Sequence, residues 1–375
     1  MPCEKENDSA DLIAQKAEEK PFENQRFCLL KRRVRFCYTN MYKTVPPCDR
    51  RINYKIMGSF EMNNSKKENL IGSVLLTVCA IIWGSSFVAQ TTGAEYVGPF
   101  TFMALRSFLG SLTLVPVILI KDAVQKKKGT YIGLKTKEEK RFFLKGSLAC
   151  GVALCIASCL QQIGIDKGTS SGKAGFITAF YILLVPIFSV VLKKKIRPII
   201  WPCAAVSLVG LYLLCVTEST IQSSDAYVLA CSIFFTVQIL IVDTVSPKVD
   251  GIKLSCCQFF VVGVLSSIPM FLFEDVSFEF IKAAAPSIAY SGIMSSGVAY
   301  TLQILGQKRT EPTVASMLMS LESVFALISG MIILHEAPSA REAVGCVLMF
   351  AAIIVAQLPE RKGKKAATSV QENKE

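Results

Sequence analysis

The stretch VCAIIWGSSFVAQ, residues 78–90, places a tryptophan, a glycine and two serines side by side in the middle of a long apolar run. A core helix of a soluble protein seldom carries two hydroxyls and a glycine at its centre. A helix that spans a lipid bilayer tolerates them, because small residues let a second helix or a solute approach its backbone closely. The stretch therefore indicates a membrane-spanning helix.

Apolar blocks of similar length recur along the chain. Hydrophobic residues make up 51% of the sequence and charged residues only 19%, whereas soluble domains carry about 25% charged residues. Period-two alternation, the mark of a membrane strand, is absent. The expected fold class is therefore an all-α membrane protein with ten transmembrane helices. Each block approaches the roughly 20 residues that a helix needs to cross the bilayer: residues 70–90, 98–120, 143–164, 173–192, 198–216, 226–246, 253–273, 284–305, 312–334 and 339–358.

The distribution of lysine and arginine predicts how these helices are oriented. A net charge of +12 would by itself also suit a nucleic-acid-binding protein. If the residues before 70 are cytoplasmic, however, 17 lysines and arginines lie in the inside loops and only 4 in the outside loops. This is the positive-inside pattern of a multi-pass protein. We expect a plasma-membrane protein of the bacterial inner-membrane type with both termini in the cytoplasm, whose partner is the lipid bilayer and not nucleic acid.

Metal ions and cofactors are not expected. The 14 cysteines include no CxxC pair, and His335 is the only histidine, so the spacing of a metal site is missing. The group TSSGK, residues 169–173, resembles the end of a phosphate loop, but the preceding strand and the full motif are absent. ATP is therefore not the expected source of energy.

The two ends of the chain differ from the part between them. Residues 1–68 mix acidic side chains with a basic run at 26–36 and contain no spanning block. They fit neither a signal peptide nor a transit peptide. We expect a disordered tail or a non-native upstream extension, in which case Met57 or Met62 is the working start. Residues 359–375 are expected to form a basic cytoplasmic tail.

The chain also carries a weak internal repeat. Residues 80–87 align with 232–239, which we call the first alignment, and residues 160–164 align with 302–306, the second alignment. The repeat predicts two five-helix units, residues 69–217 and 225–358. Because five is an odd number, the second unit enters the membrane from the opposite side. Inverted repeats of this kind are common in transporters, which bind a solute near the midplane between the two units.

The order of motifs resembles the drug/metabolite transporter superfamily, EamA type. The residues that carry this resemblance are IIWGSSFVAQ at 81–90, GPFTFMALRSFLGSL at 98–112, TSSGKAGFITAFYILLVPIFS at 169–189, TVASMLMSLESVFALISGMIILHE at 313–336 and AVGCVLMFAAIIVAQ at 343–357. The resemblance implies ten helices as two inverted repeats, with alternating-access movement of a small organic solute. One departure concerns the ninth helix, where the family often has Leu-Glu-Pro and this chain has Leu321, Glu322 and Ser323. A break in that helix is therefore less strongly indicated.

Candidate cavity residues are polar or aromatic side chains inside the apolar blocks. For the serines and Trp83, helix packing and cavity lining both remain open. Intramembrane charges are costly and therefore point to function. One hypothesis is that Arg106 and Glu322 meet and that the pair opens or closes with the solute. The alternatives are a static pair or an Arg106 side chain that snorkels to the headgroups. The glutamines offer donors and acceptors to a solute or to a neighbouring helix. The full set is Trp83, Ser85, Ser86, Arg106, Gln161, Gln238, Gln258 and Glu322.

The leading hypothesis is a secondary transporter that exports an amino acid, a metabolite or a toxic compound across the plasma membrane, with protons as a possible coupling ion. A membrane-embedded enzyme is an alternative. It would need catalytic side chains clustered at the bilayer edge, and the scattered acids do not suggest such a cluster. A non-transporting receptor or scaffold is a further alternative, and its central cavity should be closed or dry.

Overall fold

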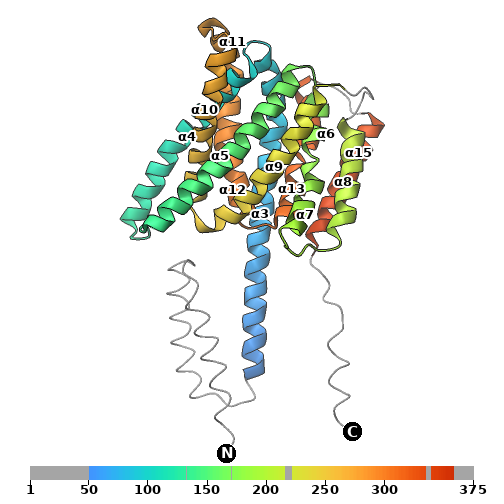
Figure 1. Ribbon diagram of the computed structural model, residues 1–375. Coiled ribbons are helices and arrows are strands. Elements are labelled where there is room, and N and C mark those ends of the chain that lie inside the picture. The colour runs from blue at the N-terminus through green and yellow to red at the C-terminus, as the bar shows by residue number, and fades with distance from the viewer. Residues whose placement is uncertain (1–49, 132, 170, 216–221, 335–338, 359–375) are drawn as a thin grey trace, which may run out of the picture. The chain divides into compact units, whose positions relative to one another are not determined.

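The computed structural model describes residues 50–131, 133–169, 171–215, 222–334 and 339–358, and every regular element in these ranges is a helix (Figure 1). Helices long and apolar enough to cross a membrane number 8 in this part of the chain. The class predicted from composition, an all-helical membrane protein, is confirmed. Residues 1–49 of the expected tail and the whole of 359–375 lie outside the described ranges, while residues 50–68 are helical.

Six of the apolar blocks each form one long helix. These helices are α3 (Arg50–Ala94), α4 (Pro99–Lys127), α5 (Lys137–Asp166), α9 (Asp225–Val245), α10 (Gly251–Phe273) and α15 (Ala340–Gln357). A short turn of 3-10 helix, η2 (Ser246–Lys248), follows α9. The fifth block forms a shorter apolar helix, α8 (Ile200–Cys215).

The remaining blocks form interrupted helices. The fourth block is divided into α6 (Ser171–Thr178) and α7 (Tyr181–Val191), and the ninth into α13 (Pro312–Met319) and α14 (Glu322–Leu334). The eighth block consists of α11 (Phe278–Tyr290), the π-helical segment η3 (Ser291–Ala299) and α12 (Tyr300–Gln307).

Local sequence explains where several helices begin. Thr136 accepts a hydrogen bond from the backbone N–H of Glu139 at the start of α5, and the Glu139 side chain accepts one from the backbone of Thr136 in return. Ser339 and Glu342 form the same capping box at the start of α15. Reciprocal caps of this kind satisfy two of the backbone N–H groups that the first turn leaves without partners.

The packing brings together helices that are far apart in the sequence. Helix α4 packs along α10, α5 along α9, and α8 along α15 (Figure 1). Gly210 and Gly345 allow the α8–α15 contact. An added Cβ on Gly210 would lie 2.7 Å from the carbonyl oxygen of Gly345, and one on Gly345 would lie 2.5 Å from that of Gly210. Side chains that are at most 1% exposed, namely Leu76, Ile182 and Met317, fill the core between α3, α7 and α13.

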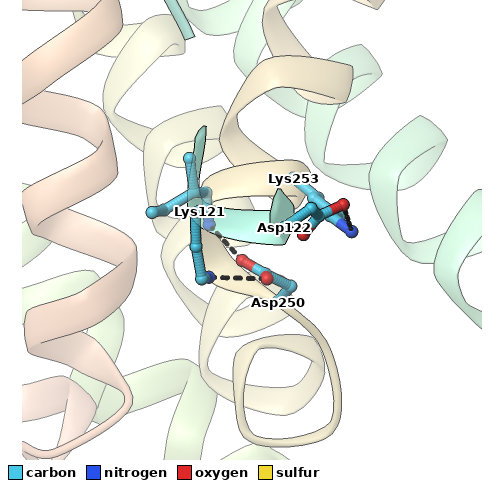
Figure 2. Close-up of polar contacts among 5 residues, drawn as sticks. Lys121, Asp122, Asp250 and Lys253 are labelled. Atoms are coloured by element: carbon cyan, nitrogen blue, oxygen red, sulfur yellow. Dashed lines mark hydrogen bonds and ion pairs between the residues drawn. The ribbon is translucent and has the colours of Figure 1, made fainter. Parts of the chain in front are cut away.

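Helices α4 and α10 run antiparallel and are joined by charges at both ends. Lys121, near the end of α4, lies 2.6 Å from Asp250, and Lys253 in the first turn of α10 lies 2.7 Å from Asp122 (Figure 2). At the opposite end, the carboxylate of Glu274 accepts hydrogen bonds from the backbone N–H groups of Phe100 and Thr101, the first turn of α4. A carboxylate at a helix N-terminus is stabilised by free N–H groups and by the helix dipole.

Glycine contacts between helices recur in related pairs. An added Cβ on Gly151 of α5 would lie 3.0 Å from the carbonyl oxygen of Gln258 on α10. An added Cβ on Gly292 of η3 would lie 3.0 Å from the carbonyl oxygen of Arg106 on α4. Arg106 and Gln258 are equivalent when the first alignment is extended along the chain, so these two glycine contacts involve equivalent positions.

A second pair of glycines repeats this arrangement. An added Cβ on Gly164 of α5 would lie 3.2 Å from the carbonyl oxygen of Ser224, and one on Gly306 of α12 would lie 3.1 Å from that of Gly72. Gly164 and Gly306 are equivalent in the second alignment, and Gly72 and Ser224 in the first.

The π-helical segment accounts for a change in register between the two halves. The second alignment, which pairs Gly164 with Gly306, would pair Gly151 with Ile293, whereas the packing makes Gly292 its counterpart. One extra residue therefore lies between Gly292 and Gly306, and η3 overlaps this interval. A π-bulge is what a helix forms when it accommodates an inserted residue, and such bulges often occur at functional sites.

The two interrupted helices break in the same way. At the first break the backbone N–H of Phe180 donates to the carbonyl of Ile177 over 3.2 Å, and at the second that of Leu321 donates to Leu318 over 3.2 Å. These bonds span three residues instead of the four of an α-helix. The ninth helix is thus interrupted at 320–321 although Ser323 stands where the family pattern has proline.

Candidate functional site

A cavity lies where the two helix breaks meet. Tyr181, the first residue of α7, donates its hydroxyl to the carboxylate of Glu322, the first residue of α14, over 3.3 Å. About 530 Å³ of space lies between the walls, counting the part that opens to solvent. The cavity is lined by Trp83, Phe87, Gln90, Arg106, Ser158, Gln161, Thr178, Tyr181, Phe235, Ile239, Ser295, Tyr300, Gln303, Met319 and Glu322.

Most of the lining side chains occupy equivalent positions in the two halves of the chain. Twelve of them form six pairs: Trp83 with Phe235, Phe87 with Ile239, Ser158 with Tyr300, Gln161 with Gln303, Thr178 with Met319, and Tyr181 with Glu322. The first two pairs follow the first alignment and the next two the second alignment, while the last two hold the same places beside the two helix breaks. Only Gln90, Arg106 and Ser295 line the cavity without an equivalent partner in the wall.

Arg106 supplies the positive charge of the cavity. Its side chain is 4% exposed, and its Nε–H donates to the Ser296 hydroxyl over 3.2 Å while Nη2–H donates to the Ser295 hydroxyl over 3.4 Å. The Phe102 ring, one turn earlier on α4, has its centroid 5.9 Å from the guanidinium carbon. A buried guanidinium is thus held by two neutral hydroxyls and a ring face.

Glu322 is the one acidic side chain among the lining residues. It is 6% exposed and receives its one side-chain hydrogen bond in the described structure from Tyr181. Among the described residues, no ion pair within 4.0 Å involves Glu322 or Arg106, so the predicted meeting of these two side chains is not seen in this conformation. The Arg106 side chain instead donates hydrogen bonds to two serines of the π-helical segment.

Aromatic rings form one wall of the cavity. The ring centroids of Trp83 and Tyr300 are 4.6 Å apart, and Phe259 packs edge-on against Tyr300 with 5.0 Å between centroids. Trp83 also packs against two clusters of buried core residues, one of which joins α3 to η3. It therefore both packs between helices and lines the cavity, the two roles that the sequence left open.

The candidate serines lie outside the lining set. Gly84 is the small residue that brings α3 against the second break, because an added Cβ would lie 2.5 Å from the carbonyl oxygen of Glu322. Ser85 faces α11, with 2.6 Å between its hydroxyl and that of Tyr290. Ser86 is 1% exposed, and no described group forms a hydrogen bond with its hydroxyl. The motif GSS therefore serves helix contact in this conformation.

Of the three candidate glutamines, one lines the cavity and two do not. Gln161 lines the cavity and donates to the Thr178 hydroxyl over 2.9 Å. Gln238 is fully buried behind the wall and accepts a hydrogen bond from Gln303 over 3.2 Å. Gln258 is also fully buried outside the lining set, with no described partner for its amide group.

Several lining residues were not predicted. Tyr181 and Tyr300 were missed because aromatic residues are common in spanning helices and carry no charge to single them out. Ser295 was missed because no sequence pattern predicts a π-helical turn. Phe235 had a usable signal, since the first alignment pairs it with Trp83.

Two other polar groups named from the sequence lie elsewhere. Lys173 of the group TSSGK pairs with Asp225 over 2.5 Å, and Thr169 donates to the same carboxylate over 3.2 Å. This ion pair joins the start of α6 to the start of α9 and is not part of a phosphate site. His335 lies outside the described residues.

Comparisons with known proteins agree with this architecture. The EamA-like transporter family matches residues 70–216 and again residues 222–357. A protein of Archaeoglobus fulgidus described as an uncharacterized transporter is 26% identical over 294 residues, which cover 78% of this chain and 87% of that protein. The uncharacterized transporter YoaV of Bacillus subtilis is 22% identical over 291 residues, or 76% of this chain and 95% of that protein.

A solved crystal structure has the same fold. It superposes with a TM-score of 0.59 at 19% identity and covers 78% of this chain and 98% of its own. The resemblance read from the sequence motifs is confirmed by the family match, which extends over both halves of the membrane-spanning region. The chain belongs to the EamA-like transporter family.

Proposed function

We propose that the chain is a secondary transporter that moves a small organic solute across the plasma membrane by alternating access, through the cavity at the two helix breaks. The observation that carries this proposal is the pairing of the cavity wall, in which twelve of the fifteen lining residues occupy equivalent positions. Because the two halves contribute equivalent lining residues, a solute meets equivalent surroundings from either side of the membrane.

The proposed architecture is two inverted five-helix repeats, residues 69–217 and 225–358. The related glycine contacts support it. In this architecture a two-fold axis in the membrane plane exchanges the halves. It relates the contact of Gly151 with Gln258 to the contact of Gly292 with Arg106. The odd number of helices in each unit and the excess of inside lysines and arginines support the same arrangement.

The broken helices suit the proposed movement. Interrupted helices at the midplane are a recurrent feature of transporter sites, where the loose turn contributes groups to the solute and permits rocking. The breaks after Thr178 and Met319 both line the cavity. Opening either side then requires the halves of α6–α7 and α13–α14 to move relative to each other.

Glu322 is the proposed coupling residue. A buried carboxylate with one hydroxyl donor and no cation is costly, and binding a proton or a cationic group would relieve that cost. In export driven by an inward proton gradient, Glu322 would bind and release one proton in each transport cycle.

Membrane-embedded catalysis is the less favoured alternative. Its required cluster of catalytic side chains at the bilayer edge has no counterpart in the cavity wall, where polar groups gather between the two breaks. A scaffold without transport activity is disfavoured because this polar cavity is present at all.

Reconstituted vesicles test the proposal. Vesicles loaded with a mixture of metabolites are diluted with and without a pH difference, and the compounds that leave are identified. We expect at least one solute to leave faster than from protein-free vesicles. Glu322→Gln should reduce proton-driven flux to below a tenth, whereas the exposed Glu95→Gln should leave it unchanged. Equal leakage from protein-containing and protein-free vesicles would contradict the proposal.

A further inference from the structure

We infer that Arg106, Ser295 and Ser296 form an anion subsite in the central cavity, which takes a carboxylate group of the solute. The inference rests on the proposed function only in assigning that carboxylate to a transported molecule. The binding chemistry follows from the side chains themselves and is measured separately below.

Arg106 is a buried cation without a described anionic partner. Its side chain is 4% exposed, and its hydrogen bonds in the described structure go to two serine hydroxyls. Neutral hydroxyls and one ring face orient a guanidinium but do not neutralise it. Burying a charge without a counter-charge is costly in general, so an anion that enters the cavity recovers stability at this position.

The hydrogen bonds leave one edge of the guanidinium open. The group has five N–H donors in a plane, and the two serines receive those of Nε and of Nη2 on the same edge. Both N–H groups of Nη1 and the second one of Nη2 have no described partner. An Nη1–H and that Nη2–H point forward in parallel, and such a fork matches the two oxygens of a carboxylate.

The π-helical turn is what brings both serines to Arg106. Consecutive residues of an α-helix are about 100° apart around the axis, since a turn holds about 3.6 residues. A π-turn holds more residues, so neighbouring side chains lie closer in direction. Ser295 and Ser296 both fall within η3, and together they hold the guanidinium of Arg106, which lines the cavity.

The charges of the wall select a monoanion. Arg106 is the one cationic side chain among the fifteen lining residues, and no second cation lies beside it in the wall. A phosphate dianion would need further cations to replace its water. Arg106 and Ser295 are also among the three lining residues whose equivalents in the other half do not line the cavity, so the subsite gives the otherwise paired cavity a single orientation for a solute.

Trp83 makes binding directly measurable. The chain has two tryptophans, Trp83 in the cavity wall and Trp201 on α8, which is 39% exposed. In a Trp201→Phe background, emission from the purified full chain in lipid nanodiscs reports on the cavity alone. The probes are phenylacetate, its neutral isostere phenylacetamide, and sodium chloride at matched ionic strength.

We expect phenylacetate to change the Trp83 emission saturably and to bind at least 10-fold more tightly than phenylacetamide. Arg106→Gln should abolish this preference, and Arg106→Lys, which keeps the charge without the fork, should retain only part of it. Ser295→Ala combined with Ser296→Ala should weaken phenylacetate binding several-fold. Ser107→Ala is the matched control, because this buried hydroxyl on α4 has no described hydrogen-bond partner.

Equal binding of phenylacetate and phenylacetamide to the Trp201→Phe protein would overturn the inference without any Arg106 variant, so misfolding of a variant cannot hide the result. Saturable binding of chloride in preference to phenylacetate would also overturn it, by assigning the subsite to a free inorganic anion. Carboxylate binding without flux in vesicles would reject the proposed transport and leave the subsite standing. Flux of neutral solutes with no carboxylate preference would reject the anion subsite and leave the proposed transport standing.

Discussion

Gly84 illustrates how one residue decides a helix contact in this protein. It follows Trp83 in the run that first indicated a spanning helix, and it lies against the backbone of the second break. An added Cβ would lie 2.5 Å from the carbonyl oxygen of Glu322 and 2.7 Å from the backbone nitrogen of Ala326. Backbone atoms cannot rotate away as a side chain can, so only glycine fits.

Gly84→Ala should therefore destabilise the protein by about 1–3 kcal/mol, the usual cost of overpacking. Thermal unfolding in detergent would measure the loss, and flux should fall with it because the break beside Glu322 must shift. Gly175→Ala is the matched control, since the nearest atom to its added Cβ is the Ser323 hydroxyl at 3.4 Å. Unchanged stability of Gly84→Ala would contradict the close contact.

The charged candidates could be found from the sequence, but their partners could not. Arg106 and Glu322 stand out because a charge inside an apolar block is costly. Both line the cavity. Their hypothesised contact is not seen in this conformation, in which Arg106 donates hydrogen bonds to Ser295 and Ser296. These serines belong to another helix, and their orientation depends on a π-turn that has no sequence signature.

At the scale of elements, the antiparallel pair α4 and α10 is held at its ends by side chains that combine two tasks. Asp250 accepts a hydrogen bond from the backbone N–H of Ile252, which caps α10, and its second oxygen pairs with Lys121 (Figure 2). Burial favours the neutral form of this carboxyl. The hydrogen bond and charge of Lys121 and the backbone N–H groups outweigh burial and hold the pKa of Asp250 below its ordinary value.

This lowered pKa predicts how stability responds to acid. A carboxyl with a lowered folded-state pKa contributes stability above its ordinary pKa of about 3.9, and the contribution is lost as pH falls through the lowered value. Asp250→Asn keeps the cap and removes the ion pair. It should cost about 0.2–1 kcal/mol at pH 7, as partly exposed pairs do, and should show a smaller loss of stability than the parent on acidification.

Thermal unfolding between pH 3 and pH 7 would measure this difference. Asp250→Ala, which removes the cap as well, should cost about 0.5–2 kcal/mol more than Asp250→Asn. The exposed Asp275→Asn is the control and should follow the parent curve. Identical acid profiles for Asp250→Asn and the parent would show that the pair contributes nothing.

At the scale of the whole molecule, the proposed two-fold relation makes separate contacts equivalent. Gly151→Ala and Gly292→Ala should each destabilise the protein by about 1–3 kcal/mol, because an added Cβ would lie 2.6 Å from Val261 in the first case and 2.9 Å from Leu109 in the second. Thermal unfolding of both variants checks this. Gly297→Ala is the control in the same π-helical segment, with no atom closer than 3.5 Å to its added Cβ. A loss confined to one variant would contradict the equivalence.

The excess of inside positive charge predicts the orientation of the molecule. In a cysteine-free background, Lys128→Cys in the loop after α4 should react with a membrane-impermeant thiol reagent only from the cytoplasmic side. Lys282→Cys at the start of α11 should react only from the outside. Lys128 and Lys282 are both exposed in the structure. Labelling of both positions from one side would exclude the proposed topology.

Composition and block length were sufficient for the class of the protein and for the approximate positions of its helices, because the thickness of the bilayer imposes a length on every spanning segment. The order of motifs was sufficient for the family. The cavity wall was decided only by tertiary structure. Helices that are apolar all around do not reveal in sequence which face turns inward, so Gln161 could not be distinguished from Gln258 before the packing was known. The break in the ninth helix and the π-turn likewise arise where neighbouring helices compensate an irregular backbone.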